Sequence, residues 1–121
     1  MRKKILVCED DEIVLTVIGV ALQGEDVEVV VARDGLQALN HLKAKNDFDL
    51  IITDIHMPHH NGDEVLALVR QEQKKKTPII MISSDDEEEV IRLALKLGVD
   101  EFIDKPIDAQ KLRKSVKKFL Q

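Results

Sequence analysis

Short apolar runs alternate along the chain with longer segments in which apolar residues recur every three or four positions. The short runs are rich in Val and Ile and have the length of β-strands. The longer segments have the periodicity of helices, and Asp11 and Gly24 suit the two ends of the first one. The pattern predicts five strands in strict alternation with five helices. The predicted strands cover residues 4–8, 27–32, 49–53, 78–83 and 101–104, and the predicted helices cover residues 11–24, 34–45, 62–73, 85–98 and 108–120.

This alternation indicates a parallel sheet with helices on both of its faces. The central runs are apolar throughout instead of alternating with polar residues, which is typical of strands that are buried on both sides. We therefore predict an α/β fold with a doubly wound, five-stranded parallel sheet. No linker, repeat or low-complexity segment divides the chain, so residues 1–121 are expected to form one domain.

The composition narrows the class of protein. Hydrophobic residues make up 44% and charged residues 34% of the 121 positions, a globular balance that argues against disorder. Aromatic residues make up only 2% and the net charge is −5, so we expect no direct nucleic-acid partner. The lone Cys8 excludes an internal disulfide, and the apolar runs are too short to cross a bilayer. We expect a cytoplasmic protein with no membrane partner.

Polar residues follow the predicted strands at their carboxyl ends, which is the edge where open parallel sheets bind ligands. They are Glu9, Asp10 and Asp11 after the first strand, Asp54 after the third, Ser83 and Ser84 at the fourth, and Lys105 after the fifth. Each residue alone suits a helix cap, a loop or a surface charge. Their common position at one edge instead indicates a site.

Carboxylates gathered at one edge repel one another, by about 4 kcal/mol for two unit charges about 4 Å apart at an effective dielectric of about 20. A raised carboxylate pKa, the ammonium of Lys105 or a divalent cation could offset this repulsion. Hard oxygen ligands favour Mg²⁺, with Mn²⁺ as the other possibility. A carboxylate beside such a cation, an ammonium and a hydroxyl has the parts that phosphoryl transfer needs.

Five motifs, in this order, resemble the response-regulator receiver domain of two-component signalling across essentially the whole chain. They are ILVCEDDE (5–12), VVVARDGLQAL (29–39), DLIITDIHMPHHNG (49–62), TPIIMISS (77–84) and GVDEFIDKP (98–106). The resemblance implies the (βα)5 flavodoxin-like receiver fold. It also implies a phosphorylation-activated switch that promotes its own phosphotransfer and dephosphorylation, and not an enzyme that turns over a separate substrate.

The resemblance assigns the acceptor and the metal ligands. Asp54 would accept the phosphoryl group from the phosphohistidine of a sensor histidine kinase or phosphotransfer protein. Glu9, Asp10 and Asp54 would hold Mg²⁺ together with the backbone carbonyl of His56. The imidazole of His56 could also influence the lifetime of the phosphoryl group, although a solvent-facing ring without a role is the simpler interpretation.

The resemblance also assigns the parts of the switch. Ser83 would donate its hydroxyl to the phosphoryl group, and Lys105 would form an ion pair with it. Phe102 would be the aromatic residue that turns inward, and the peptide bond between Lys105 and Pro106 would be cis. The fourth helix, fifth strand and fifth helix would then present a changed surface to an output partner that the sequence does not identify.

This sequence departs from the commonest family pattern at four positions. Glu9 stands where Asp is frequent, and Ser83 stands where Thr is frequent. Ser84 stands where a small residue such as Ala is usual, and Phe102 stands where Tyr is frequent. These replacements keep the carboxylate, the hydroxyl and the aromatic ring. Because the chain starts at Met1 and ends after the fifth predicted helix, we expect a free-standing receiver, with a module of a longer regulator as the alternative.

Three other functions stay open from the sequence. A transition-metal protein could use His56, His59, His60 and Asp63, although adjacent histidines after Pro58 are expected to diverge. A phosphatase with an aspartate nucleophile would need that aspartate on the first strand, whereas the candidate nucleophile lies on the third. A degenerate, unphosphorylated receiver would act only as an interaction module, although every required side chain is present.

Overall fold

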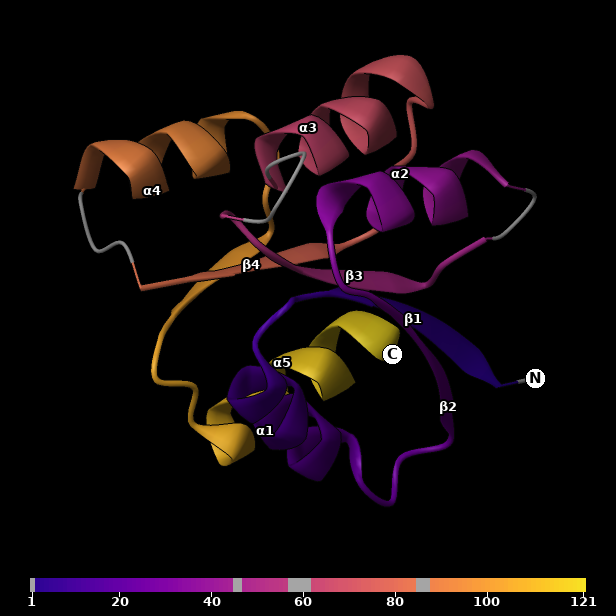
Figure 1. Cartoon of the computed structure of the whole chain (residues 1–121), viewed down its shortest axis with the longest axis vertical. Coiled ribbons are helices and arrows are strands. Elements are labelled where there is room, and N and C mark those ends of the chain that lie inside the picture. Colours follow the sequence, from indigo (N-terminus) through magenta and orange to yellow (C-terminus); the bar gives the residue numbers. More distant parts are fainter. Residues whose placement is uncertain (1, 45–46, 57–61, 85–87) are drawn as a thin grey trace.

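The computed structural model describes residues 2–44, 47–56, 62–84 and 88–121, which form a parallel sheet between two layers of helices (Figure 1). The strand order is β2-β1-β3-β4-β5, and each neighbouring pair is parallel. The strands are β1 (Lys3–Cys8), β2 (Val27–Ala32), β3 (Leu50–Asp54), β4 (Ile79–Ser83) and β5 (Glu101–Asp104). The predicted doubly wound α/β fold is confirmed.

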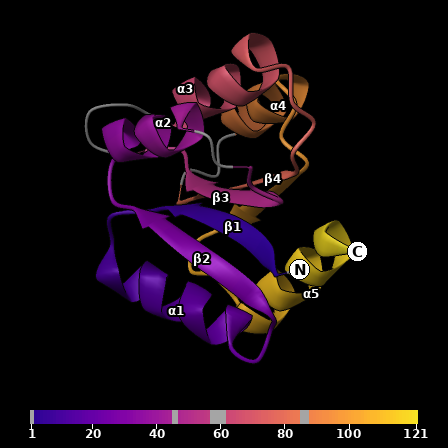
Figure 2. The ribbon, with the colours of Figure 1, turned by 90° about the vertical axis from the view of Figure 1, so that its right-hand side faces the viewer.

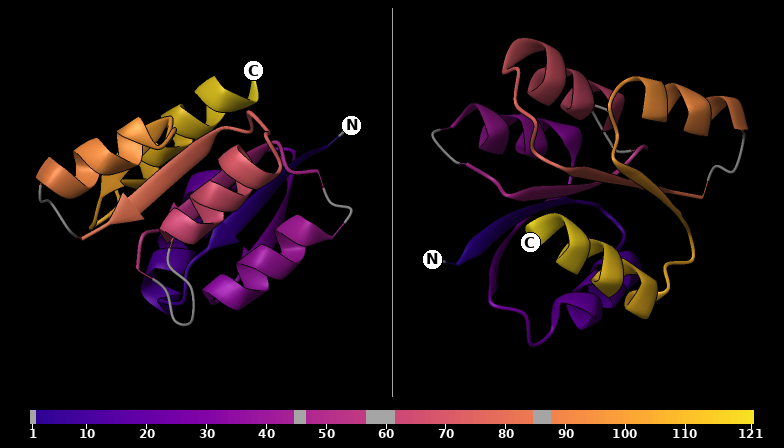
Figure 3. Two further views of the ribbon diagram at one scale, coloured as in Figure 1. Left: turned by 90° about the horizontal axis from the view of Figure 1, so that it is seen from above. Right: turned by 180° about the vertical axis from the view of Figure 1, so that it is seen from behind.

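Helices cover both faces of this sheet. One face carries α1 (Glu12–Leu22) and α5 (Ala109–Leu120), which lie side by side (Figures 1 and 2). The other face carries α2 (Gly35–Lys43), α3 (Gly62–Ala67) and α4 (Glu88–Lys96), with α3 between its two neighbours (Figure 3). The strands whose carboxyl ends carry the predicted polar residues are therefore packed between two layers of helices.

Several predicted helix boundaries were wrong. The helix predicted over residues 62–73 is α-helical only to Ala67 and continues as the π-helical segment η1 (Leu68–Glu72), where the N–H of Gln73 donates to the carbonyl of Leu68 at 2.8 Å. The helix predicted over residues 34–45 ends at Lys43, because the backbone is extended at the next residue. Of the helix predicted over residues 85–98, the first three residues lie outside the described part of the chain.

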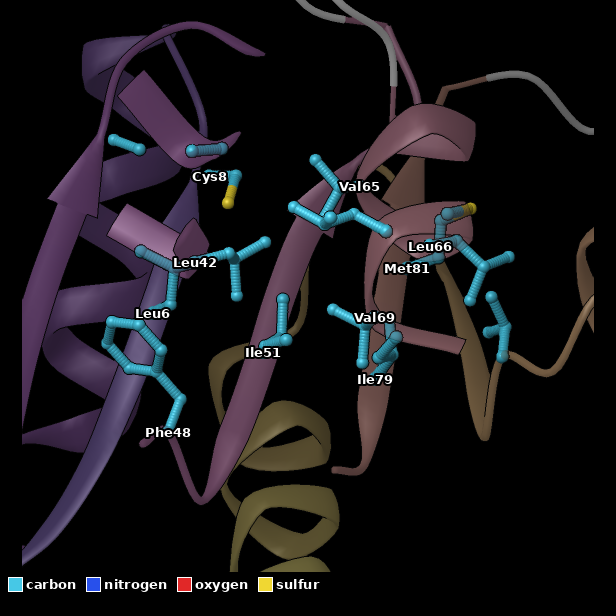
Figure 4. Close-up of a cluster of buried hydrophobic side chains, with 14 of the residues drawn as sticks. Leu6, Cys8, Leu42, Phe48, Ile51, Val65, Leu66, Val69, Ile79 and Met81 are labelled. Atoms are coloured by element: carbon cyan, nitrogen blue, oxygen red, sulfur yellow. The ribbon is translucent and has the colours of Figure 1, made fainter. Parts of the chain in front are cut away.

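The core consists of two clusters, one on each face of the sheet. Because side chains along a strand point alternately to opposite faces, successive residues of β1, β3 and β4 contribute to different clusters. Figure 4 shows the cluster beneath α2 and α3, which is built almost entirely from aliphatic side chains and includes Cys8. This double burial explains why the central strands are apolar at consecutive positions.

Aspartate side chains start three of the helices at the carboxyl edge of the sheet. Asp11 accepts hydrogen bonds from the N–H groups of Ile13 and Val14 at the start of α1, as predicted. Asp34 and Asp108 cap α2 and α5 in the same way. Strand ends and helix starts therefore meet at one edge. None of the helices in the described ranges is both long enough and apolar enough to cross a bilayer.

Candidate functional site

An acidic cluster lies at the carboxyl edge of the two central strands. Cys8 of β1 pairs with Thr53 of β3, so the residues that follow, Glu9 and Asp54, are neighbours across the sheet. Together with Asp10 they form a group whose carboxylate oxygens lie within 4.8 Å of one another. Glu9 is fully buried, Asp54 is 5% exposed and Asp10 is exposed. Parallel strand pairing thus brings together three of the four acids that the sequence placed at this edge, whereas Asp11 caps α1.

The ammonium of Lys105 lies between two of these acids. Its Nζ is 2.7 Å from Asp54 Oδ2 and 3.0 Å from Glu9 Oε1. The backbone N–H of Lys105 donates to the carbonyl of Ser83 at 2.9 Å, which fixes the segment after β5 against the end of β4. Burial alone would lower the pKa of Lys105, but the hydrogen bonds and charges of Asp54 and Glu9 outweigh it and raise the pKa. Lys105 therefore stays cationic and offsets the repulsion between the acids.

The buried carboxylate of Glu9 turns back onto its own loop. Its Oε2 accepts hydrogen bonds from the backbone N–H groups of Asp10 and Asp11, each at 3.0 Å. Burial raises the pKa of Glu9, while the N–H of Asp11 and the ammonium of Lys105 act in the opposite direction, and the charge of Asp54 raises it further. The net direction is upward, because burial is the largest cause.

Hydrogen bonds hold both the side chain and the backbone of Asp54. Asp54 Oδ1 accepts the N–H of His56 at 3.0 Å, and the carbonyl of Asp54 accepts the hydroxyl of Thr53 at 3.0 Å. Gly62 donates its N–H to the carbonyl of Ile55 at 2.9 Å and packs so closely that a Cβ there would lie 2.4 Å from the carbonyl oxygen of Asp54. Thr53 was not predicted from the sequence, where its one signal is a hydroxyl within an apolar strand.

The remaining predicted residues lie on β4, on β5 and directly after β5. Ser83 is the last residue of β4 and is fully buried. Phe102 lies in β5 and packs, partly buried, against the core cluster under α2 and α3. The peptide bond between Lys105 and Pro106 is cis, as predicted. The structure therefore groups the acids with Lys105, and it places Ser83 on an adjoining strand end and Phe102 on the neighbouring strand.

The histidine-rich loop is only partly described. His56 is exposed, and the group of described residues that could hold a metal ion consists of carboxylates alone. Asp63 is exposed at the start of α3, where its Oδ1 accepts the N–H of Glu64 at 3.0 Å. His59 and His60 lie outside the described residues. A transition-metal site in this loop therefore stays a hypothesis, as does a role for the His56 ring.

Cys8 lies directly before the acidic cluster and is fully buried. Burial raises its thiol pKa from 9.0 to about 12, a rise that the hydroxyl of Thr53 opposes and the charge of Glu9 increases. Because the thiolate is the reactive form, we expect native protein at mildly alkaline pH to be inert to Ellman's reagent. Complete reaction is expected once guanidinium unfolds the chain, and rapid reaction of the native protein would contradict this environment.

The raised pKa of Cys8 also affects the stability of the folded protein at high pH. The native pKa of Cys8 lies above that of an exposed thiol, so the unfolded chain loses its proton first as the pH rises. This contribution to stability is therefore complete below pH 9.0 and is lost progressively toward about pH 12.

The donor set of the cluster suits a hard divalent cation. Glu9, Asp10 and Asp54 offer carboxylate oxygens at a spacing that one ion could bridge, and the described group contains no sulfur or imidazole ligand. Such a donor set fits Mg²⁺ or Mn²⁺ better than a tetrahedral zinc site. Together, the fold and the site define a doubly wound α/β protein with an acidic, lysine-containing site at the carboxyl edge of its sheet.

Comparison with known proteins identifies the family. The sequence profile of the response regulator receiver domain matches residues 5–117, and the chain belongs to this family. Receiver domains act as phosphorylation-dependent switches in two-component signal transduction, where they work with sensor kinases and output domains. The chain is thus a receiver domain of the response-regulator type.

Individual relatives agree with this assignment. The alkaline phosphatase synthesis transcriptional regulatory protein PhoP of Bacillus subtilis is 36% identical over all of this chain and 50% of its own length. A CheY-like receiver domain protein of Methanospirillum hungatei JF-1 is 27% identical with a TM-score of 0.88, covering 99% of this chain and 94% of that one. The phosphorylated cyanobacterial phytochrome response regulator RcpA is 29% identical with a TM-score of 0.83, covering 98% and 91% of the two chains. The chain spans half or less of the length of the first curated relatives that it matches.

Proposed function

We propose that residues 1–121 form one receiver domain in which Asp54 accepts a phosphoryl group from the phosphohistidine of a sensor histidine kinase or phosphotransfer protein. The observation that carries this proposal is the setting of Asp54. It ends a central strand at the ligand-binding edge, belongs to the acidic cluster, and has Lys105 Nζ 2.7 Å from its Oδ2. The solved phosphorylated form of RcpA supports the proposal, because that relative is similar over nearly the whole chain.

The chemistry follows from the groups around Asp54. A carboxylate oxygen of Asp54 forms a bond to phosphorus while the bond between phosphorus and the donor's imidazole nitrogen breaks, and its electron pair stays on that nitrogen. An ionised carboxylate needs no general base for this attack. The ammonium of Lys105 neutralises charge on the transferred group, and the N–H of His56 orients the carboxylate through Oδ1.

We further propose that the acidic cluster holds Mg²⁺, with Mn²⁺ as a substitute and the carbonyl of His56 as an additional ligand. When bound, the ion neutralises charge on the phosphoryl oxygens during transfer. Glu9, Asp10 and Asp54 would hold it, because their carboxylate oxygens already lie within 4.8 Å of one another. Without the ion, Lys105 is the cation that offsets the acids.

The switch would start from the new charge at Asp54. Phosphorylation adds roughly −1.5 to −2 charges and several acceptor oxygens at this edge. We propose that Ser83 donates its hydroxyl to the phosphoryl group, that Phe102 turns inward in response, and that α4, β5 and α5 carry the change to an output partner. A change in population from roughly 1:99 to 99:1 requires about 5.5 kcal/mol of differential stabilisation, which a few charge-assisted hydrogen bonds can largely supply.

Labelling by a small-molecule donor tests the proposed function. Purified protein incubated with acetyl phosphate and Mg²⁺ is expected to gain the mass of one phosphoryl group in intact-protein mass spectrometry. Removal of the cation with EDTA should abolish the gain, because the clustered acids then repel the anionic donor. Addition of Mn²⁺ should restore it. If no phosphoryl group is gained with either metal, the chain acts as an unphosphorylated interaction module.

A further inference from the structure

We infer that the outer edge of β2 binds the same edge of a second copy of this chain, so that the sheets of the two copies become continuous across a two-fold axis. This interface goes beyond the proposed function and does not depend on phosphorylation. β2 and β5 lie at opposite edges of the sheet, so a second copy on β2 leaves the proposed output surface accessible. Figure 2 views the molecule from the side of β2, with α1 and α2 on either side of the strand.

The first observation is the direction of the backbone groups along β2. The carbonyl of Ala32 points to β1, where it accepts the N–H of Glu9 at 3.0 Å. Backbone groups alternate in direction along a strand, so Val29 and Val31 direct their N–H and C=O groups away from β1. Among the strands of the described ranges, β2 has β1 as its one neighbour. The outward groups of these two valines are therefore open to a further strand.

Hydrogen bonds to loop and helix residues limit this open edge at both ends. The N–H of Val27 donates to the carbonyl of Glu25 at 3.0 Å. The N–H of Arg33 donates to Oε1 of Gln37 at 2.9 Å. A strand that binds here can therefore form a complete pattern of hydrogen bonds with the short segment between these two residues.

One antiparallel register uses all the outward groups of this segment. With the two-fold axis at Val30, Val29 of each copy lies opposite Val31 of the other, and each N–H meets a carbonyl. An axis at Val29 would instead place Val31 opposite Val27, whose N–H is already used. The edge is thus complementary to itself in the register that is centred at Val30.

The side chains at this edge are apolar and reach the solvent. Val29 is 41% exposed and Val31 is 40% exposed, and both line a groove with Leu15 and Gly19 of α1. A Cβ at Gly19 would meet no atom within 4 Å, so the groove is open above this residue. In the proposed register the corresponding valines of the second copy lie beside Val29 and Val31 and remove this apolar surface from water.

The charges at the two ends of β2 suit an antiparallel partner. The side chain of Asp26, which precedes the strand, is 84% exposed, and that of Arg33, which follows it, is 53% exposed. The carboxylate of Asp34, beside Arg33, is already used as the cap of α2. The two-fold axis brings the start of one strand beside the end of the other, so each Arg33 comes close to Asp26 of the second copy. Within the strand, Glu28 lies opposite the small Ala32.

Sedimentation velocity of the unphosphorylated full chain, without divalent cations, tests for the second copy. Over concentrations from about 1 µM to about 1 mM we expect a reversible shift from the monomer to a species of twice its mass. Growth should stop there, because a two-fold interface is closed. A monomer at every concentration would overturn the inference, and so would continued growth to larger species.

Two double variants test the register. Val29→Lys with Val31→Lys places like charges opposite each other and should weaken association by at least about tenfold. Val29→Lys with Val31→Glu places opposite charges there, so this variant should associate more tightly than the double lysine variant. Equal association of the two variants, or the reverse order, would overturn the proposed register.

Val20→Lys is the control for these charge changes. Val20 is also an exposed apolar residue, 52% exposed, but it lies on the side of α1 that faces α5. This variant should associate as the wild type does. Weakening equal to that of the double lysine variant would show that the interface does not lie at β2.

Oxidation of single-cysteine variants with diamide gives a second measurement. Val30→Cys should form a disulfide between two copies, because the two side chains lie opposite each other at the axis, about 4.5–5.5 Å apart at Cβ. Glu28→Cys is the matched control: its side chain is more exposed, but the two copies of residue 28 lie roughly 13 Å apart along the strands. Cys8 is fully buried and is expected not to react.

Non-reducing electrophoresis measures the covalent dimer. We expect it for Val30→Cys and not for Glu28→Cys, and equal cross-linking of the two variants, or none in either, would overturn the inference. Circular dichroism shows whether each variant is folded. If Val30→Cys does not fold, the charge variants decide, because the side chains of Val29 and Val31 are exposed and leave the core unchanged.

Discussion

Replacement of Asp54 by Asn is expected to abolish phosphorylation of the protein by acetyl phosphate in the presence of Mg²⁺. The amide has no anionic oxygen to attack phosphorus, and it replaces the oxygen that lies 2.7 Å from Lys105 Nζ with a neutral group. The loss should be complete, because Glu9, the other buried carboxylate of the cluster, has its Oε2 occupied by two backbone N–H donors. Intact-protein mass spectrometry measures the result directly.

Asp11→Asn is the matched control for this experiment. It makes the same chemical change at the same edge of the sheet, but Asp11 caps α1 and does not belong to the acidic cluster. Asparagine caps helices about as well as aspartate, so the fold should be unaffected and labelling should persist. Labelling of Asp54→Asn at the wild-type level would show that the acceptor lies elsewhere, and loss of labelling in Asp11→Asn would show that charge at this edge, not the acceptor, limits the reaction.

Replacement of Gly62 by Ala should destabilise the protein by about 1–3 kcal/mol and slow its phosphorylation. The new Cβ would lie 2.4 Å from the carbonyl oxygen of Asp54 and 3.0 Å from Cα of Ile55. Both contacts are with backbone, which cannot rotate away, so the strand end or the start of α3 must shift. Because Asp54 is the proposed acceptor, the shift also changes the position of the reacting carboxylate. Urea unfolding followed by circular dichroism gives the stability, since the chain has no Trp or Tyr.

Gly19→Ala is the control for Gly62→Ala. Gly19 lies inside α1, and a Cβ there would meet no atom within 4 Å. Alanine favours a helix over glycine by about 0.5–1 kcal/mol, so this variant should be more stable than the wild type and equally well phosphorylated. A lower free energy of unfolding for Gly62→Ala and a higher one for Gly19→Ala would establish close packing at Asp54 as the cause of the destabilisation. Stabilisation of both variants would contradict the tight contact.

The sequence predicted the elements well wherever local pattern and tertiary environment agree. The apolar runs of β1, β3 and β4 correspond to strands buried on both faces, and Asp11 caps α1 as its position indicated. The prediction was wrong at the end of the third helix, where the backbone hydrogen bonds shift to the π-helical pattern of η1. Periodicity cannot distinguish these patterns over a single turn, because both place apolar residues on the same side.

The sequence could not predict the individual roles of the acids that follow the first strand. The sequence placed Glu9, Asp10 and Asp11 together after the first strand, because a parallel sheet brings its carboxyl ends to one edge. The structure separates them: Glu9 is buried against Lys105, Asp10 is exposed in the cluster, and Asp11 caps a helix. Three consecutive acids have the same local signature, so only their surroundings distinguish them.

The sequence by itself determined the alternation of elements, the doubly wound fold and the edge at which the polar residues collect, since these depend on hydrophobic periodicity and on the geometry of parallel sheets. The tertiary structure decided the contacts that join distant segments. Lys105 contacts Glu9 and Asp54, which lie far from it in the sequence. Gly62 packs so closely against the carbonyl of Asp54 that no Cβ would fit between them. Such contacts depend on side-chain direction and interatomic separation, which are properties of the folded chain and not of its local pattern.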